Sequence, residues 1–74
     1  MNKVEGILKD IRPEFDFTVS EDFFEDGMLD SFDMVTLVSD LDKSYGISIA
    51  GTDILPENFS SISRIEQLLR KYVS

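Results

Sequence analysis

The residues in this chain that could do chemistry centre on one serine at a predicted helix start. Asp30 and Ser31 stand in the stretch GMLDSFDMVTLV, residues 27–38, just before an amphipathic segment. A serine at its ordinary pKa needs a neighbouring base to act as a nucleophile. The chain has no histidine, and no lysine lies near Ser31 in the sequence. The sequence therefore argues against serine catalysis, and we expect a protein that is not an enzyme and has no catalytic residue.

Metal chemistry has equally little support. The absence of cysteine excludes disulfides and thiolate metal sites, and the absence of histidine removes the commonest metal ligand. A calcium-binding loop beginning at Asp40 would need Gly at its sixth position and Glu at its twelfth. Those positions hold Tyr45 and Gly51, and Lys43 intrudes. We therefore expect no metal site.

Ser31 has two possible structural roles. As the N-cap of a helix, its oxygen would accept a backbone N–H and be occupied. Asp30 can cap equally well, with Asp33 three residues on, and Ser31 would then be the first helical residue with a free, exposed hydroxyl. An unactivated serine of that kind is typical of a residue that another protein modifies. A phosphate ester there would meet the N–H groups and the positive dipole end of a helix.

The chain is short, and its apolar pattern is helical. Residues 1–74 are expected to form one domain, and a chain of this length buries only about 60% of its unfolded surface. A stripe at i, i+3, i+4 and i+7 predicts a first helix at about 2–12, formed by Val4, Ile7, Leu8 and Ile11. Asn2 with Glu5 resembles a capping box, and Pro13 ends the helix.

A long connection and two further helices follow. Residues 13–29 form the connection, which four aromatic residues are expected to pack down: Phe15, Phe17, Phe23 and Phe24. A second helix runs from Asp30 or Ser31 to Tyr45 and ends at Gly46. A short helix is expected around Asp53 to Phe59. The last helix begins near Ser60 or Ser61, with one apolar face made of Ile62, Ile65, Leu68, Leu69 and Tyr72. The predicted fold is all-α, a small antiparallel bundle of three main helices plus one short helix, with a long first loop.

The second helix has two apolar faces. At about 100° per residue, its core stripe consists of Met34, Leu37, Val38, Leu41 and Tyr45. Phe32 lies almost opposite that stripe, and the same outer side has Val35, Thr36 and Ser39, flanked by Asp33 and Asp40. A central aromatic residue with a polar rim is the usual anatomy of a protein-binding hot spot. The alternative is that Phe32 folds back onto the first loop.

The charge is strongly negative and unevenly placed. Seven basic residues against fifteen acidic ones give −8, which argues against nucleic acid as a partner. Between Pro13 and Asp42 there is no Lys or Arg, and there are ten acids: Glu14, Asp16, Glu21, Asp22, Glu25, Asp26, Asp30, Asp33, Asp40 and Asp42. This run either keeps the surface solvated or steers basic partner proteins to it. With no apolar N-terminal run or membrane-length segment, we expect a cytoplasmic protein without membrane insertion.

Three segments together resemble the acyl and peptidyl carrier proteins. Gly27–Phe32 is similar to the G-x-x-D-S-L segment of that family, Tyr45–Ile49 to its F-G-I-x-I, and Asn58–Ile62 to the turn and cap before its last helix. The resemblance implies that Ser31, beside Asp30, receives a covalent 4′-phosphopantetheine arm that carries an acyl or aminoacyl group as a thioester. It also implies a partner-binding surface on the helix that follows, made of Phe32, Asp33, Val35, Thr36, Ser39 and Asp40.

The resemblance also sets expectations about partners and cargo. It implies a phosphopantetheinyl transferase, a loading ligase or transferase, and later acyl-processing enzymes acting on a stand-alone, monomeric carrier. Fatty acyl, polyketide and aminoacyl cargo, including D-alanyl, stay open. The family usually has Leu where Phe32 stands, and its main fatty-acid carriers usually have Glu where Thr36 stands, which leans away from the housekeeping fatty-acid carrier. The acyl chain is expected to enter between the helices, in a pocket lined by Met34, Leu37, Leu41 and Ile65.

A second function stays open beside the carrier. An acidic helical adaptor could bind one partner through Phe32 and Val35 and never be modified. It explains the outer patch and the charge, and it leaves Asp30 and Ser31 as capping residues only.

Overall fold

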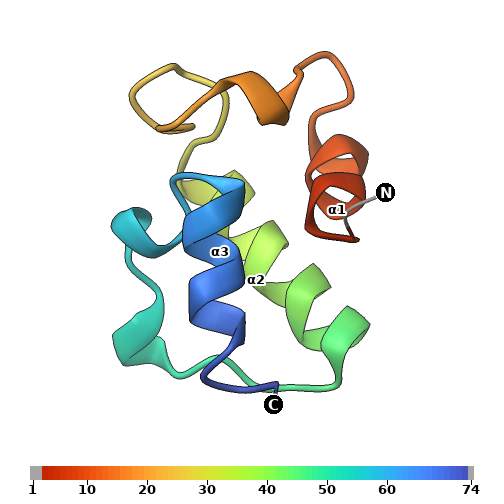
Figure 1. The fold of residues 1–74 in the computed structure, drawn as a ribbon, viewed down its shortest axis with the longest axis vertical. Helices are drawn as coiled ribbons and strands as arrows, with labels where there is room; N and C mark the ends of the chain where they lie inside the picture. Colours follow the sequence, from red (N-terminus) through yellow and green to blue (C-terminus); the bar gives the residue numbers. More distant parts are fainter. Residues whose placement is uncertain (1–2, 74) are drawn as a thin grey trace.

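Several ends of the three α-helices lie at local signals in the sequence. The structure is a computed structural model that describes residues 3–73 (Figure 1). Helix α1 spans Lys3–Ile11. Its last turn is closed by the Arg12 N–H, which donates to the Leu8 carbonyl at 2.9 Å. Pro13 follows, and its ring disfavours helical geometry at the residue before it. The capping box predicted at Asn2 lies outside the described residues.

Helices α2 and α3 confirm the predicted elements. Helix α2 spans Ser31–Tyr45 and ends at Gly46, whose φ of 65° is in the left-handed region that glycine adopts without strain. Helix α3 spans Ile62–Leu69, and the Ser61 hydroxyl caps it by accepting the N–H of Arg64 at 3.1 Å. In Figure 1, α1 runs upward while α2 and α3 run downward. The all-α bundle of three main helices is therefore confirmed.

The predicted short helix at Asp53 to Phe59 differs from the structure. Two single 3₁₀ turns, η2 (Gly51–Asp53) and η3 (Pro56–Asn58), take its place. Leu55 between them is extended, with φ −123° and ψ 142°. Pro56 explains the break, because its ring pushes Leu55 out of helical geometry and it has no N–H to continue a helix. A further 3₁₀ turn, η1 (Phe17–Val19), lies within the first loop.

The first loop is packed against the core by its aromatic residues. Phe17 and Phe23 are fully buried, and their rings meet edge to face with centroids 5.0 Å apart. The Phe23 N–H donates to the Ser60 carbonyl at 2.7 Å, which ties the loop to the segment before α3. Phe15 and Phe24 are partly buried against the same core. The prediction that these four aromatics hold the long connection down is confirmed.

The last turns of the chain are fixed by a polar contact. Tyr72, predicted on the apolar face of the last helix, follows the end of α3 and is half-buried. Its hydroxyl donates to Asp53 at 2.5 Å and accepts the Ala50 N–H at 3.0 Å. Lys71 pairs with the same Asp53 carboxylate at 3.0 Å. The loop after α2 is thereby joined to the C-terminal side of α3. Within residues 3–73, no helix is both long enough and apolar enough to cross a bilayer.

A comparison of two phenylalanines tests this packing. Phe23→Ala removes a side chain with 0% exposure, whereas Phe32→Ala removes one that is 83% exposed. We expect Phe23→Ala to lose about 3–5 kcal/mol of unfolding free energy. That is a large part of the about 4–11 kcal/mol that a chain of this length has in total. Phe32→Ala, the control, should stay within about 0.5 kcal/mol of wild type. Urea denaturation followed by circular dichroism measures both, and equal losses would contradict the structure.

Candidate functional site

The start of α2 is closed by Asp30 and leaves Ser31 uninvolved. The Asp33 N–H donates to Asp30 Oδ1 at 2.9 Å, and the Asp30 N–H donates to Asp33 Oδ2 at 3.3 Å, which completes a capping box. Ser31 is the first residue of α2 and is exposed. Within residues 3–73, its hydroxyl has no hydrogen-bond partner. Of the two roles that the sequence allowed, the N-cap therefore belongs to Asp30.

A guanidinium from the end of α1 reaches the same place. Arg12 Nε donates to Asp33 Oδ2 at 2.9 Å, Nη2 lies 3.8 Å from Asp30 Oδ2, and Nη1 lies 3.7 Å from Glu14 Oε2. The hydrogen bond to Asp33, followed by the attraction of the carboxylates, raises the pKa of Arg12. No functional role is predicted for Arg12 from the sequence. Its one signal was position, because Arg12 is the last basic residue before the acidic run that ends at Asp42.

The same contacts determine the orientation of Asp33 and the pKa of Asp30. Sequence reasoning placed Asp33 on the outer rim of α2, but its side chain is only 14% exposed and is turned toward Arg12. The pKa of Asp30 is lowered, chiefly because its carboxylate accepts the backbone N–H of Asp33, and also because Arg12 attracts it. The Asp30 carboxylate is thus held in its ionised form beside Ser31.

The outer face of α2 is apolar and open to solvent. Phe32 is 83% exposed and Val35 is 64% exposed, so Phe32 does not fold back onto the first loop. Thr36 is exposed, and its hydroxyl donates to the Phe32 carbonyl at 3.2 Å. Ser39 is exposed and Asp40 is half-buried. Of the predicted partner-binding residues, all but Asp33 therefore present at least part of their side chain to solvent without an ion pair in the described structure.

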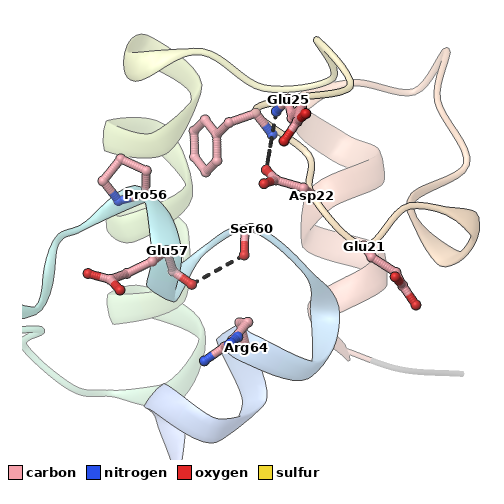
Figure 2. A pocket seen from close by; sticks show the side chains of 8 residues that line it. Glu21, Asp22, Glu25, Pro56, Glu57, Ser60 and Arg64 are labelled. Carbon is pink, nitrogen blue, oxygen red and sulfur yellow. Dashed lines mark hydrogen bonds between the residues drawn. The ribbon is translucent and has the colours of Figure 1, made fainter.

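The residues predicted to line an acyl pocket belong to the closed core. Leu37, Leu41 and Ile65 each have 0% exposure, and Met34 is half-buried against them. A surface pocket of about 450 Å³ lies elsewhere, between the first loop and the segment that begins α3 (Figure 2). Its lining is mostly polar and consists of Glu21, Asp22, Phe24, Glu25, Pro56, Glu57, Ser60 and Arg64. A smaller pocket of about 240 Å³ is lined by Tyr45, Glu66, Leu69, Arg70 and Val73.

Two of the polar side chains around the larger pocket bind the local backbone. Figure 2 shows the Asp22 carboxylate turned toward the loop, where it accepts the N–H groups of Phe24 and Glu25, both at 3.2 Å. The Ser60 hydroxyl donates to the Glu57 carbonyl at 3.2 Å. Across residues 3–73, no three acidic side chains come together in a way that could hold a metal ion.

A comparison with protein families identifies the chain. The family model described as a phosphopantetheine attachment site matches residues 2–69. The chain belongs to this family. Members of the family carry a covalently attached 4′-phosphopantetheine and act as carrier domains. Searches of curated proteins and of solved structures found no significant match.

The start of α2 fits such a group. The Ser31 hydroxyl is exposed and unpaired within the described residues, so it can form a phosphate ester without breaking a contact of the fold. The N-terminal turn of a helix and a guanidinium are both suited to a phosphate. This chain has no cysteine, so a thiol at this site would have to come from the attached arm.

The charge of Asp30 gives a pH-dependent prediction. A carboxylate whose pKa is lowered by folding contributes stability above its unfolded value of about 3.9, and that contribution is lost as the pH falls through the lower folded value. Asp30→Asn keeps a capping oxygen but loses the charge. We therefore expect a lower urea midpoint than wild type at pH 7 and a gap that closes below about pH 4.

The control is Asp40→Asn, which makes the same charge change on the same helix. No hydrogen bond or ion pair of the Asp40 carboxylate occurs within residues 3–73, so no comparable loss is expected at neutral pH. A gap between Asp30→Asn and wild type that does not change with pH would show that the charge of Asp30 contributes nothing.

Proposed function

We propose that this protein carries an acyl or aminoacyl group as a thioester on a 4′-phosphopantetheine arm attached to Ser31, with residues 1–74 acting as one carrier domain. The observation that carries the proposal is the exposed Ser31 hydroxyl, which stays unpaired in the described structure because Asp30 caps α2. The match to the phosphopantetheine attachment family supports it.

The chain would act as a tether and lower no reaction barrier. It has no histidine or cysteine, and the cation nearest the start of α2 is a guanidinium, which stays protonated and cannot act as a base. A tether instead raises the effective concentration of its cargo at each enzyme that docks. Fatty acyl, polyketide and aminoacyl cargo, including D-alanyl, all fit this role.

The partners would dock on the outer face of α2 in the cytoplasm. Phe32 and Val35 supply an apolar centre, and Thr36, Ser39 and Asp40 supply a polar rim. Asp33 contributes by fixing the helix start, through its bonds to Arg12 and Asp30. The net charge of −8 suits partners with basic surfaces, including a phosphopantetheinyl transferase and a loading ligase or transferase. Phe32 and Thr36 favour a partner set unlike that of housekeeping fatty-acid carriers.

Attachment at Ser31 is tested by modification in vitro. The purified protein is incubated with coenzyme A and a broad-specificity phosphopantetheinyl transferase, and its intact mass is measured. We expect one phosphopantetheine on wild type and none on Ser31→Ala, because that variant lacks the acceptor oxygen. Ser44→Ala, which removes an exposed hydroxyl of α2 outside the proposed docking face, is the control and should be modified like wild type.

The same experiment separates the carrier from the adaptor. An adaptor that binds a partner through Phe32 and Val35 would use the same exposed face without any modification. A wild-type mass that does not change would favour the adaptor. An arm still added to Ser31→Ala would place the attachment at another residue and contradict the role of Ser31.

Docking on the outer face is tested by truncating its centre. Phe32→Ala should raise the KM of the transferase for this protein about tenfold, the effect of losing about 1.4 kcal/mol at an aromatic anchor. Its circular dichroism spectrum should match that of wild type, because the side chain is 83% exposed. Val19→Ala is the control, because Val19 is 79% exposed but lies in the first loop. Equal KM values for the two variants would place the docking surface elsewhere.

A further inference from the structure

Arg12 is the basic residue that meets the start of α2. In the sequence, no Lys or Arg follows it until Lys43. In the structure its guanidinium lies 3.8 Å from the carboxylate of Asp30, the residue directly before Ser31. Asp30 is the N-cap of α2 and Ser31 is its first residue, so the guanidinium lies against the helix start that presents Ser31. The cation and the proposed attachment site therefore share one small region.

Most of the donors of Arg12 are not used by the fold. A guanidinium has five N–H donors. Within residues 3–73, only Nε makes a hydrogen bond, to Asp33 at 2.9 Å. Nη1 and Nη2 lie 3.7 and 3.8 Å from carboxylate oxygens, which is beyond hydrogen-bond distance. The side chain is 38% exposed. Arg12 is thus held in place by one nitrogen and has two others open to a further acceptor.

The charge around this region is unfavourable for an incoming phosphate. Glu14, Asp30 and Asp33 lie around Arg12, so three carboxylates face one guanidinium. A phosphate brought to Ser31 adds a further negative charge, and like charges at these distances repel. Without Arg12, every charged side chain of this group would oppose the modification.

We infer that Arg12 is a positioning residue for the modification of Ser31: it offsets the carboxylates beside the acceptor hydroxyl and offers its Nη donors to the phosphate. This inference rests on the proposed function, since it needs Ser31 to be the acceptor. The reaction forms a bond between Ser31 Oγ and the phosphate of coenzyme A that carries pantetheine. It breaks the pyrophosphate bond, releases adenosine 3′,5′-bisphosphate and passes the serine proton to the transferase. In this step Arg12 transfers no proton, and the only reacting group that it contacts is the phosphate.

The first test is the rate of modification. kcat/KM for transfer from coenzyme A is measured by intact mass for wild type, Arg12→Gln and Arg70→Gln. Arg70 is exposed at the end of α3 and lines a pocket with Tyr45, at the opposite end of α2 from Ser31, so its variant makes the same charge change far from the site. We expect Arg12→Gln to be about fivefold slower, the effect of one charge pair at about 4 Å in water. Arg70→Gln should stay near the wild-type rate.

The second test separates contact with the phosphate from a structural role. Urea midpoints are measured for the unmodified and the modified forms of wild type and Arg12→Gln. Loss of the hydrogen bond to Asp33 and of the ion pair with Asp30 lowers both midpoints, but contact with the phosphate predicts a larger loss in the modified form. Arg12→Lys gives the same comparison if Arg12→Gln does not fold. Lysine has all its donors on one nitrogen, whereas Arg12 binds Asp33 through Nε and has its Nη donors on separate nitrogens, so the modified form should again lose more.

The outcomes also separate this inference from the proposed function. A wild-type protein that accepts no arm would end the proposed function itself. A wild-type protein that is modified, with Arg12→Gln as fast as Arg70→Gln, would overturn only the role of Arg12. Equal losses of stability in the unmodified and modified forms would also overturn it, because Arg12 would then serve the fold alone.

Discussion

The arrangement around Ser31 depends on the carboxylate of Asp33, which holds the start of α2 from two sides. One of its oxygens accepts both the backbone N–H of Asp30 and the Nε of Arg12. The first contact belongs to the capping box, and the second joins α2 to the end of α1. The first turn of any helix has N–H groups that need partners. Because Asp30 and Asp33 form the capping box, the hydroxyl of Ser31 is not needed to cap the helix.

Helix α2 packs into the core on one side and leaves an apolar face exposed on the other, because the chain is small. Leu37 and Leu41 are fully buried and pack into the core, while Phe32 and Val35 on the other side of the same helix are largely exposed. A chain of 74 residues has no spare layer of structure to cover such a face. Large apolar side chains left in water, with polar neighbours around them, are typical of a surface that another protein covers.

The sequence predicted those parts of the structure that local chemistry decides. Pro13, Gly46 and Ser61 each act on the residues next to them, and they set the end of α1, the end of α2 and the start of α3. The sequence allowed either Asp30 or Ser31 as the N-cap of α2. The hydrogen bonds between Asp30 and Asp33 show that Asp30 is the cap. The short helix expected around Asp53 to Phe59 is present only as the 3₁₀ turn Pro56–Asn58, because Pro56 keeps Leu55 out of helical geometry.

Contacts between distant residues could not be predicted in the same way. Arg12 and Asp33 are 21 residues apart, and nothing in either segment specifies the other as its partner. The orientation of Asp33 was missed for that reason, since a helical wheel places a side chain by angle and cannot show a neighbouring helix drawing it inward. The prediction of an acyl pocket also rested on a pattern that does not specify contacts. A stripe of Leu37, Leu41 and Ile65 predicts burial equally well whether the space between them is open or filled, and in the structure these side chains are fully buried.

The proposed docking face and the proposed attachment residue are linked by the rigidity of one helix. Ser31 and Val35 are four residues apart, which is about 6 Å along the axis of an α-helix, and Phe32 lies between them in sequence. A partner that covers Phe32 and Val35 would therefore come within a few side-chain lengths of the base of the arm. The distance is fixed only if α2 begins at the same residue each time, and the bonds of Asp33 to Asp30 and Arg12 are what fix that start. Docking and presentation of the cargo would then depend on one ion-paired helix cap.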